Sequence, residues 1–143
     1  MILVTRSIPH PSDALWQVLS DVREWPTWLP TVDALRAVEP ERPDGVGASY
    51  VLEQPGLPRA TWTITDWRPG VGFTWRSRTV GILSTGRHEL EPVATGTVVR
   101  LSIEWTGPLA WVVRLGYGRK AARYVEQEAQ ALDRATATRA ENT

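Results

Sequence analysis

Cysteine is absent from this chain, and histidine, phenylalanine and methionine are scarce. The absence of cysteine excludes disulfides, thiolate nucleophiles and iron–sulfur clusters, and His10 and His88 alone cannot complete a standard zinc site. Carboxylates leave open only a weak site for a hard metal ion. The sequence also lacks a phosphate-binding loop, a dinucleotide-binding fingerprint and a nucleophile elbow. We therefore expect no metal and no other cofactor.

Neither an excess of charge nor a long apolar run is present. Sixteen Lys and Arg residues balance sixteen Asp and Glu residues, so we expect neither nucleic acid nor an anionic membrane surface as a partner. The longest apolar run, residues 109–113, is far below the ~20 residues that cross a bilayer. The N-terminus has no signal-peptide pattern. We expect a cytoplasmic protein without membrane insertion. Its oligomeric state is either a monomer or a homodimer.

Tryptophan, in contrast, is abundant, with eight residues. Its large apolar ring and single N–H donor suit either a bulky core or an aromatic-lined pocket. The length of 143 residues fits one domain, and no repeat, low-complexity tract or linker divides the chain. We therefore expect residues 1–143 to form a single domain.

The order of apolar and turn-forming residues predicts an α+β domain. Residues 2–8 form a β-prone run, and the apolar residues between 15 and 22 recur at helical spacing. Residues 25–30 begin and end near prolines and fit a short second helix or a tight corner. Turn signals then separate six β-prone runs, which lie near residues 32–39, 47–54, 60–67, 72–79, 82–91 and 97–106. Runs this close, with no helix between them, indicate an antiparallel meander.

The last part of the chain predicts one long helix. Pro108 suits its first position, where a missing N–H costs no hydrogen bond. Small and apolar residues then recur in steps of four and three, which gives one face that must pack along the sheet. This face comprises Trp111, Leu115, Gly118, Ala122, Val125, Ala129 and Leu132, widened by Tyr117, Ala121 and Tyr124. The polar residues after Arg134 are expected to fray.

Several residues occur in an order that is similar to a known family. They are Pro11, Trp16, Asp21, Trp25-Pro26, Trp28, Pro30, Gly45-Val46-Gly47, Trp62, Pro69-Gly70, Phe73, Trp75, Gly86, His88 and Gly107-Pro108. In this order the chain resembles the polyketide cyclase/dehydrase-like branch of the START-related helix-grip (SRPBCC) superfamily, from about Ile2 to Arg134. The resemblance implies a β-α-α-β6-α fold, in which a curved, antiparallel, seven-stranded sheet surrounds a long C-terminal helix. It also implies an elongated cavity for apolar small molecules, without implying one reaction.

Strand alternation predicts which side chains face that cavity, because the more apolar set of each strand should point inward. One register slip would invert the assignment. On the strands this set includes Tyr50, Leu52, Gln54, Trp62, Ile64, Phe73, Trp75, His88, Leu101, Ile103 and Trp105, and on the helix it includes Leu115, Tyr117, Gly118, Ala121 and Tyr124. The small helix residues permit two outcomes: Trp62, Trp75 and Trp105 either line a cavity or fill the space themselves.

His88 and Asp66 are the candidate catalytic residues. His88 lies mid-strand on the inward face, where it could act as a general acid or base or donate to a ligand carbonyl. Alternatively, it is a core histidine whose ring is satisfied by a backbone carbonyl or a tyrosine. Asp66 precedes the turn at Pro69 and Gly70, where it either faces the cavity mouth or bonds nearby backbone N–H groups.

Three functions are consistent with these features. The first is binding of a hydrophobic small molecule, lipid-like or aromatic and polyketide-like, with polar contacts from His88, Tyr50 and Gln54. The second is a polyketide cyclase or dehydratase that folds its substrate in the cavity, with His88 moving protons. The third is a protein-interaction module, which predicts an exposed apolar patch with Trp67 on the outer face as its first sign.

Overall fold

A computed structural model describes residues 1–142, and the order of its elements follows the sequence-based expectation. The elements are β1 (Ile2–Ile8), α1 (Ser12–Leu19), the 3-10 helix η1 (Val22–Glu24), α2 (Trp25–Trp28), β2 (Ala34–Ala37), β3 (Ser49–Glu53), β4 (Ala60–Arg68), β5 (Gly72–Thr79), β6 (Ile82–Val93), β7 (Gly96–Thr106) and α3 (Ala110–Glu141). The predicted strands and helices are therefore all present, with boundaries that differ by a few residues.

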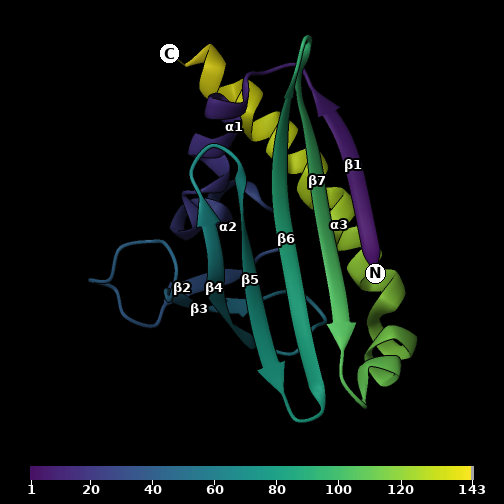
Figure 1. Ribbon diagram of the computed structural model, residues 1–143. Helices are drawn as coiled ribbons and strands as arrows, with labels where there is room; N and C mark the ends of the chain where they lie inside the picture. Colours follow the sequence, from purple (N-terminus) through teal and green to yellow (C-terminus); the bar gives the residue numbers. More distant parts are fainter. Residues whose placement is uncertain (143) are drawn as a thin grey trace.

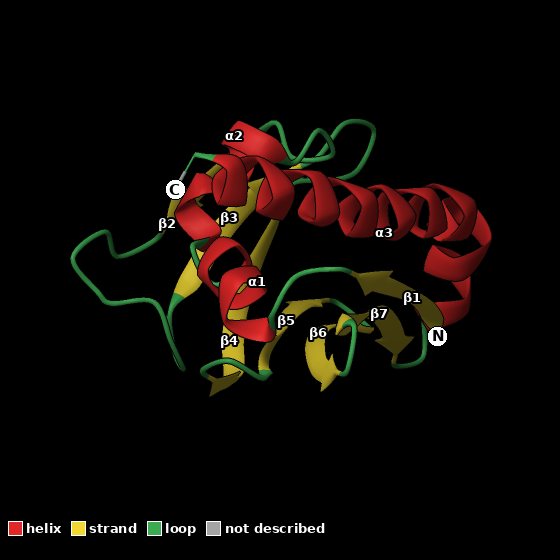
Figure 2. Ribbon diagram, turned by 90° about the horizontal axis from the view of Figure 1, so that it is seen from above, coloured by secondary structure: helices red, strands yellow, loops and turns green. Residues whose placement is uncertain are grey.

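One antiparallel sheet of seven strands forms the body of the protein, in the order β1-β7-β6-β5-β4-β3-β2. Strands β2 to β7 pair in chain order, and β1 closes the other edge against β7. The sheet curves, and α3 lies across its concave face, with α1 and α2 near the C-terminal part of α3 (Figures 1 and 2). This arrangement confirms the predicted helix-grip fold.

Tight turns between the long strands depend on glycine. Gly70 and Gly81 have φ angles of +79° and +75°, in the left-handed region where a side chain is strained. Gly70 lies in the β4–β5 turn and Gly81 in the β5–β6 turn, so both hairpins reverse within a few residues. The result is a continuous meander with no helix inserted between β2 and β7.

Helix α3 differs from the sequence-based expectation at both ends. Trp111 and Leu115 were expected to face the sheet, but they are 59% and 81% exposed. Trp111 and Leu115 lie on the side of α3 that faces away from the sheet, whereas Ala110 and Val113 in the same turns pack against Trp105. At the other end, the residues after Arg134 do not fray in the structure: the helix continues to Glu141, and Thr136 is buried.

A β-bulge in β4 inverts the predicted alternation in the second half of that strand. Ile64 pairs with Trp75, but Asp66 pairs with the adjacent Thr74, so one extra residue is inserted between them. As a result Trp67 packs inward on Phe73, with ring centroids 5.5 Å apart. Asp66 turns to the outside, so of its two predicted roles the one in which it faces the cavity mouth is wrong.

Candidate functional site

Two neighbouring chambers lie between the sheet and α3. The inner chamber has a volume of about 80 Å³ and the outer chamber a volume of about 260 Å³. The same six residues, Leu52, Gln54, Leu57, Trp62, Ile103 and Ala121, line both of them. Because they share these walls, the two chambers form one elongated site that narrows toward the middle of the sheet.

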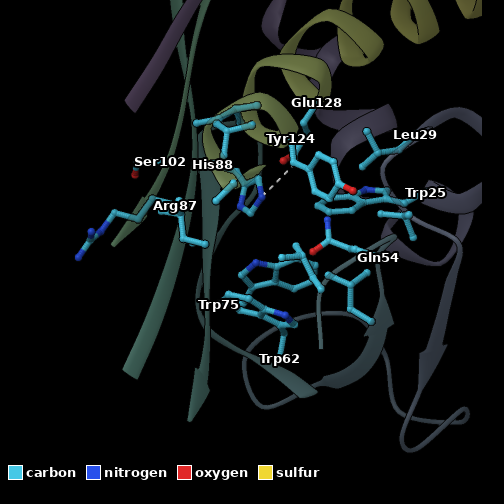
Figure 3. Close-up of a pocket in the computed structure, with 18 residues that line it drawn as sticks. Trp25, Leu29, Gln54, Trp62, Trp75, Arg87, His88, Ser102, Tyr124 and Glu128 are labelled. Atoms are coloured by element: carbon cyan, nitrogen blue, oxygen red, sulfur yellow. Dashed lines mark ion pairs between the residues drawn. The ribbon is translucent and has the colours of Figure 1, made fainter. Parts of the chain in front are cut away.

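The inner chamber ends at a pair of ionisable side chains from opposite walls. His88 extends from β6 and Glu128 from α3, and Nε2 of His88 lies 3.3 Å from Oε1 of Glu128 (Figure 3). The two side chains are only 5% and 16% exposed. Among the described residues, Oε1 of Glu128 has no hydrogen-bond partner, because the approach of His88 is not aligned as a hydrogen bond.

The orientation of the His88 ring is fixed by its neighbours. Nδ1 lies 3.3 Å from the carbonyl oxygen of Phe73, and the imidazole stacks on the Phe73 ring at a centroid distance of 4.2 Å. Trp25 and Trp75 contact the ring edge-on, each at 5.6 Å. A carbonyl can only accept, so this contact places a proton on Nδ1 and leaves Nε2 directed at Glu128.

A loop that follows β3 is tethered to α3 beside the site. The Tyr124 hydroxyl donates to the carbonyl of Pro55, and Nζ of Lys120 donates to the carbonyl of Gly56 at 3.3 Å. Leu57 on the same loop lines both chambers. The loop therefore forms part of the wall, and two contacts from the helix hold it in place.

The tryptophans both line and fill the space. Trp25 and Trp75 are buried and pack against each other at 5.2 Å, while Trp62 and Trp105 form walls of the outer chamber. Gly86 makes room for Trp75: a Cβ at this position would lie 2.8 Å from the indole nitrogen. The larger opening therefore lies in the outer chamber, beyond Trp62.

Most of the residues predicted to face the cavity lie on its walls. These are Leu52, Gln54, Trp62, Trp75, His88, Leu101, Ile103, Trp105, Tyr117, Ala121 and Tyr124. Ile64 and Phe73 are buried in the core behind the wall. Leu115 is exposed, and neither Leu115 nor Gly118 lines either chamber. Asp66 forms an ion pair with Arg68 at 3.0 Å on the outside of the sheet.

Tyr50 points away from the cavity into a separate polar cluster. Its hydroxyl donates to Asp44, and that carboxylate also accepts from Nε of Arg23 at 3.1 Å. Burial and, next, the hydrogen bond to Asp44 raise the pKa of the Tyr50 phenol strongly above its ordinary value of 10.0. Arg23 also donates to the carbonyls of Pro40 and Arg42. The cluster therefore anchors the loop between β2 and β3.

Sequence reasoning missed Glu128, the partner of His88. The candidate residues from the sequence did not include Glu128, although position 128 follows Ala121, Tyr124 and Val125 by seven, four and three residues. That spacing places it on the face that packs on the sheet. Trp67, the expected sign of an exposed interaction surface, is half-buried and packs edge-on against Trp16 at 5.0 Å.

Residues 1–142 contain no group of three or more His, Asp or Glu side chains that could hold a metal ion. Within the same residues, no helix has the length and apolar character that crossing a bilayer requires.

A curved antiparallel sheet that holds a long C-terminal helix over a cavity defines a ligand-binding fold of the SRPBCC type. The family model described as "Polyketide cyclase / dehydrase and lipid transport" matches residues 1–141. The chain therefore belongs to this family, as its sequence features predicted.

Solved structures share the fold at low sequence identity. The Zhui aromatase/cyclase from Streptomyces sp. R1128 has a TM-score of 0.74 and 16% identity, over 97% of this chain and 94% of that one. Norcoclaurine synthase from Thalictrum flavum, in complex with dopamine and hydroxybenzaldehyde, also has a TM-score of 0.74 and 16% identity, over 96% and 86%. Protein MLL2253 from Mesorhizobium loti has a TM-score of 0.69 and 19% identity, over 93% and 96%. No curated protein matches by sequence.

Proposed function

We propose that the protein binds an apolar small molecule with one polar end, lipid-like or aromatic, in the site between the sheet and α3. The apolar body would occupy the outer chamber against Trp62, Trp105 and Ile103. The polar end would enter the inner chamber and meet His88 and Glu128. The family and the neighbours above support a fold of this kind, and the residues that line the chambers support an apolar ligand with one polar end.

Oε1 of Glu128, which accepts no hydrogen bond from the described residues, carries this proposal. A buried carboxyl oxygen without a partner costs free energy, and a ligand hydroxyl or amine that donates to it would remove that cost. Nε2 of His88 offers a second polar contact at the same point. An apolar site that ends in a few convergent polar groups is the usual arrangement of a small-molecule pocket.

Mass spectrometry of the purified protein tests the proposal directly. We expect native spectra to contain an added mass of a few hundred daltons that is absent from denatured spectra. The variant Ala121→Phe, which fills the wall shared by both chambers, should lose this mass, while Ala122→Phe, which lines neither chamber, should retain it. If the protein is purified without ligand, the fluorescence enhancement of 8-anilinonaphthalene-1-sulfonate provides the same test. The Ala121→Phe variant should lose the enhancement, and the Ala122→Phe variant should retain it. Equal behaviour of the two variants in both measurements would refute the site.

A cyclase or dehydratase is the second candidate, and the His88–Glu128 pair favours it. An intramolecular aldol step needs a base that removes a proton from carbon and an acid that protonates the new alkoxide, and loss of water follows from the product. Two adjacent groups that share one proton can perform both transfers in turn. The cavity would supply the proximity of the reacting carbons. Under this hypothesis His88→Gln and Glu128→Gln each abolish turnover of a poly-β-ketone model substrate while its binding persists; under simple binding, no turnover is observed in the wild type.

A further inference from the structure

Large apolar side chains are exposed together at the end of the molecule where α3 begins. The N–H of Leu109 donates to the carbonyl of Gly81 at 3.0 Å, so the β5–β6 turn lies beside the start of α3 (Figure 1). This turn carries Val80, which is 91% exposed. We define the apolar tip as the exposed side chains Val80, Leu109, Trp111, Val112 and Leu115. None of them lines either chamber, so ligand binding inside the cavity does not explain their exposure.

Basic residues predominate in the segments around the apolar tip, and Glu104, which directly precedes one of these segments, pairs with one of the basic side chains. Residues 54–60, 76–88 and 105–125 contain eight of the sixteen Lys and Arg residues and none of the sixteen Asp and Glu residues. Of these eight, only Arg87 forms an ion pair within residues 1–142, with Glu104 at 3.2 Å. The net charge of zero therefore does not describe these segments, in which basic residues outnumber acidic ones. The sequence-based expectation that the protein has no anionic membrane surface as a partner rested on the sum of the charges. It did not include their distribution over the surface.

The exposed face of α3 combines both features. Val112, Leu115, Arg119 and Arg123 follow one another at spacings of three, four and four, so they share one face, and all four are exposed. Along this face two apolar side chains come first and two basic side chains come next. Leu115 and Arg119 are about 6 Å apart along the helix axis, from a rise of 1.5 Å per residue. A bilayer surface has the matching order, with acyl chains beneath a layer of phosphates.

From this surface we propose that the apolar tip docks on an anionic lipid bilayer, entering only the headgroup region. Trp111 and its aliphatic neighbours would insert, because an indole is favourable at the boundary between headgroups and acyl chains. The basic residues behind the tip would contact the lipid phosphates. Val113 and Tyr117, on the same turns of α3, line the outer chamber, so docking brings that chamber close to the bilayer. Membrane docking would thus provide an apolar ligand with a short path into the protein.

Vesicle flotation tests the proposal, using the full chain with no ligand added, so that its outcome is independent of cavity binding. We expect the wild type to float with vesicles of equimolar phosphatidylcholine and phosphatidylglycerol, and not with phosphatidylcholine alone. The double variant Arg119→Glu/Arg123→Glu should lower the partition coefficient about 30-fold or more. Trp111→Ser/Leu115→Ser should also lower it, because the inserted apolar area is lost. These positions are exposed, and circular dichroism verifies that each variant is folded.

A matched control uses the same helix and the same charge change at its other end. Arg134→Glu/Arg139→Glu alters two exposed arginines outside the tip and should leave flotation unchanged. The proposal is overturned if the wild type does not float with anionic vesicles, or if this control loses binding as much as the variant at 119 and 123. Retention of the wild type on immobilised polyglutamate without any flotation would assign the face to an acidic protein, and would also overturn it.

Discussion

Nε2 of His88 and Oε1 of Glu128 lie 3.3 Å apart, although His88 projects from a central strand and Glu128 from the helix that covers the sheet. The contact crosses the inner chamber and joins its two walls. The carbonyl oxygen of Phe73 contacts Nδ1 of His88, and the Phe73 ring stacks on the imidazole. These two contacts orient the imidazole so that Nε2 faces Glu128. The predictions below separate what this pair and its surroundings contribute to stability from what they contribute to binding.

Glu128→Leu should stabilise the protein and impair its binding. The substitution removes a buried carboxyl oxygen that has no hydrogen-bond partner and adds apolar contacts in the inner chamber. We expect the free energy of unfolding in urea to rise by about 1 kcal/mol or more, because a buried polar atom without a hydrogen bond costs about that much. Glu126→Leu, at an exposed position of the same helix, should not change it measurably. A large loss of stability in Glu128→Leu would indicate that Glu128 has a structural role.

Gly86→Ala should disturb the aromatic wall. The new Cβ would lie 2.8 and 2.9 Å from two atoms of the Trp75 indole, so the ring must move. We expect a loss of about 1–3 kcal/mol in unfolding free energy, which is typical of overpacking. Near-ultraviolet circular dichroism should change as well, because Trp75 contacts Trp25, Trp62 and His88.

The control for this substitution is Gly118→Ala, where the added Cβ meets no atom within 4 Å. Because Gly118 lies inside α3, alanine should raise stability by about 0.5–1 kcal/mol. Loss of stability in both variants would mean that the close approach of Trp75 to Gly86 does not determine the effect.

Stability should fall at high pH through Tyr50. Its pKa is raised in the folded state, so the folded protein holds the phenol proton more tightly than the unfolded chain does. The contribution is therefore fully present below the ordinary value of 10.0 and is lost as pH rises toward the folded value. Urea unfolding at about pH 9 and about pH 11 measures this loss. Tyr50→Phe should reduce the difference between the two conditions, and the exposed Tyr117→Phe should retain it; the same difference in both variants would contradict the assignment.

Tyr124→Phe and Lys120→Met should loosen the wall of the site without unfolding the protein. Each removes one contact that holds the loop at Pro55 and Gly56 to α3, and one such hydrogen bond contributes about 1 kcal/mol. We expect faster amide hydrogen exchange in residues 54–59 and faster release of 8-anilinonaphthalene-1-sulfonate. Tyr117→Phe lacks such a tether and should exchange like the wild type. Unchanged exchange in all three variants would exclude a tethering role.

Much of the fold could be predicted from residue spacing. The meander follows from β-prone runs separated by glycine and proline turns, and the long helix follows from its apolar recurrence. Leu52 of β3, His88 of β6 and Leu101 of β7 also agree with simple alternation, because all three line the inner chamber, whereas Tyr50 of β3 lines neither chamber. Local periodicity is sufficient for these elements because each strand remains regular over the residues concerned.

Prediction failed where long-range packing decides orientation. The bulge in β4, which turns Asp66 outward and Trp67 inward, arises from the pairing of β4 with β5 and leaves no pattern in either strand alone. The exposure of Leu115 depends on which side of the first turns of α3 packs on the sheet, and apolar residues on both sides of these turns leave that choice open in the sequence. The role of Glu128 required knowing that its helix face meets His88.

The sequence by itself determined the elements, their order and the family, because turn chemistry and apolar spacing act over a few neighbouring residues. Only the tertiary structure decided that His88 and Glu128 meet in the inner chamber and that basic side chains lie near the apolar tip. Those properties depend on distances between residues far apart in the chain, such as His88 and Glu128, or Gly81 and Leu109. Composition gives the sum of the charges, whereas folding places the basic ones together around an exposed apolar tip.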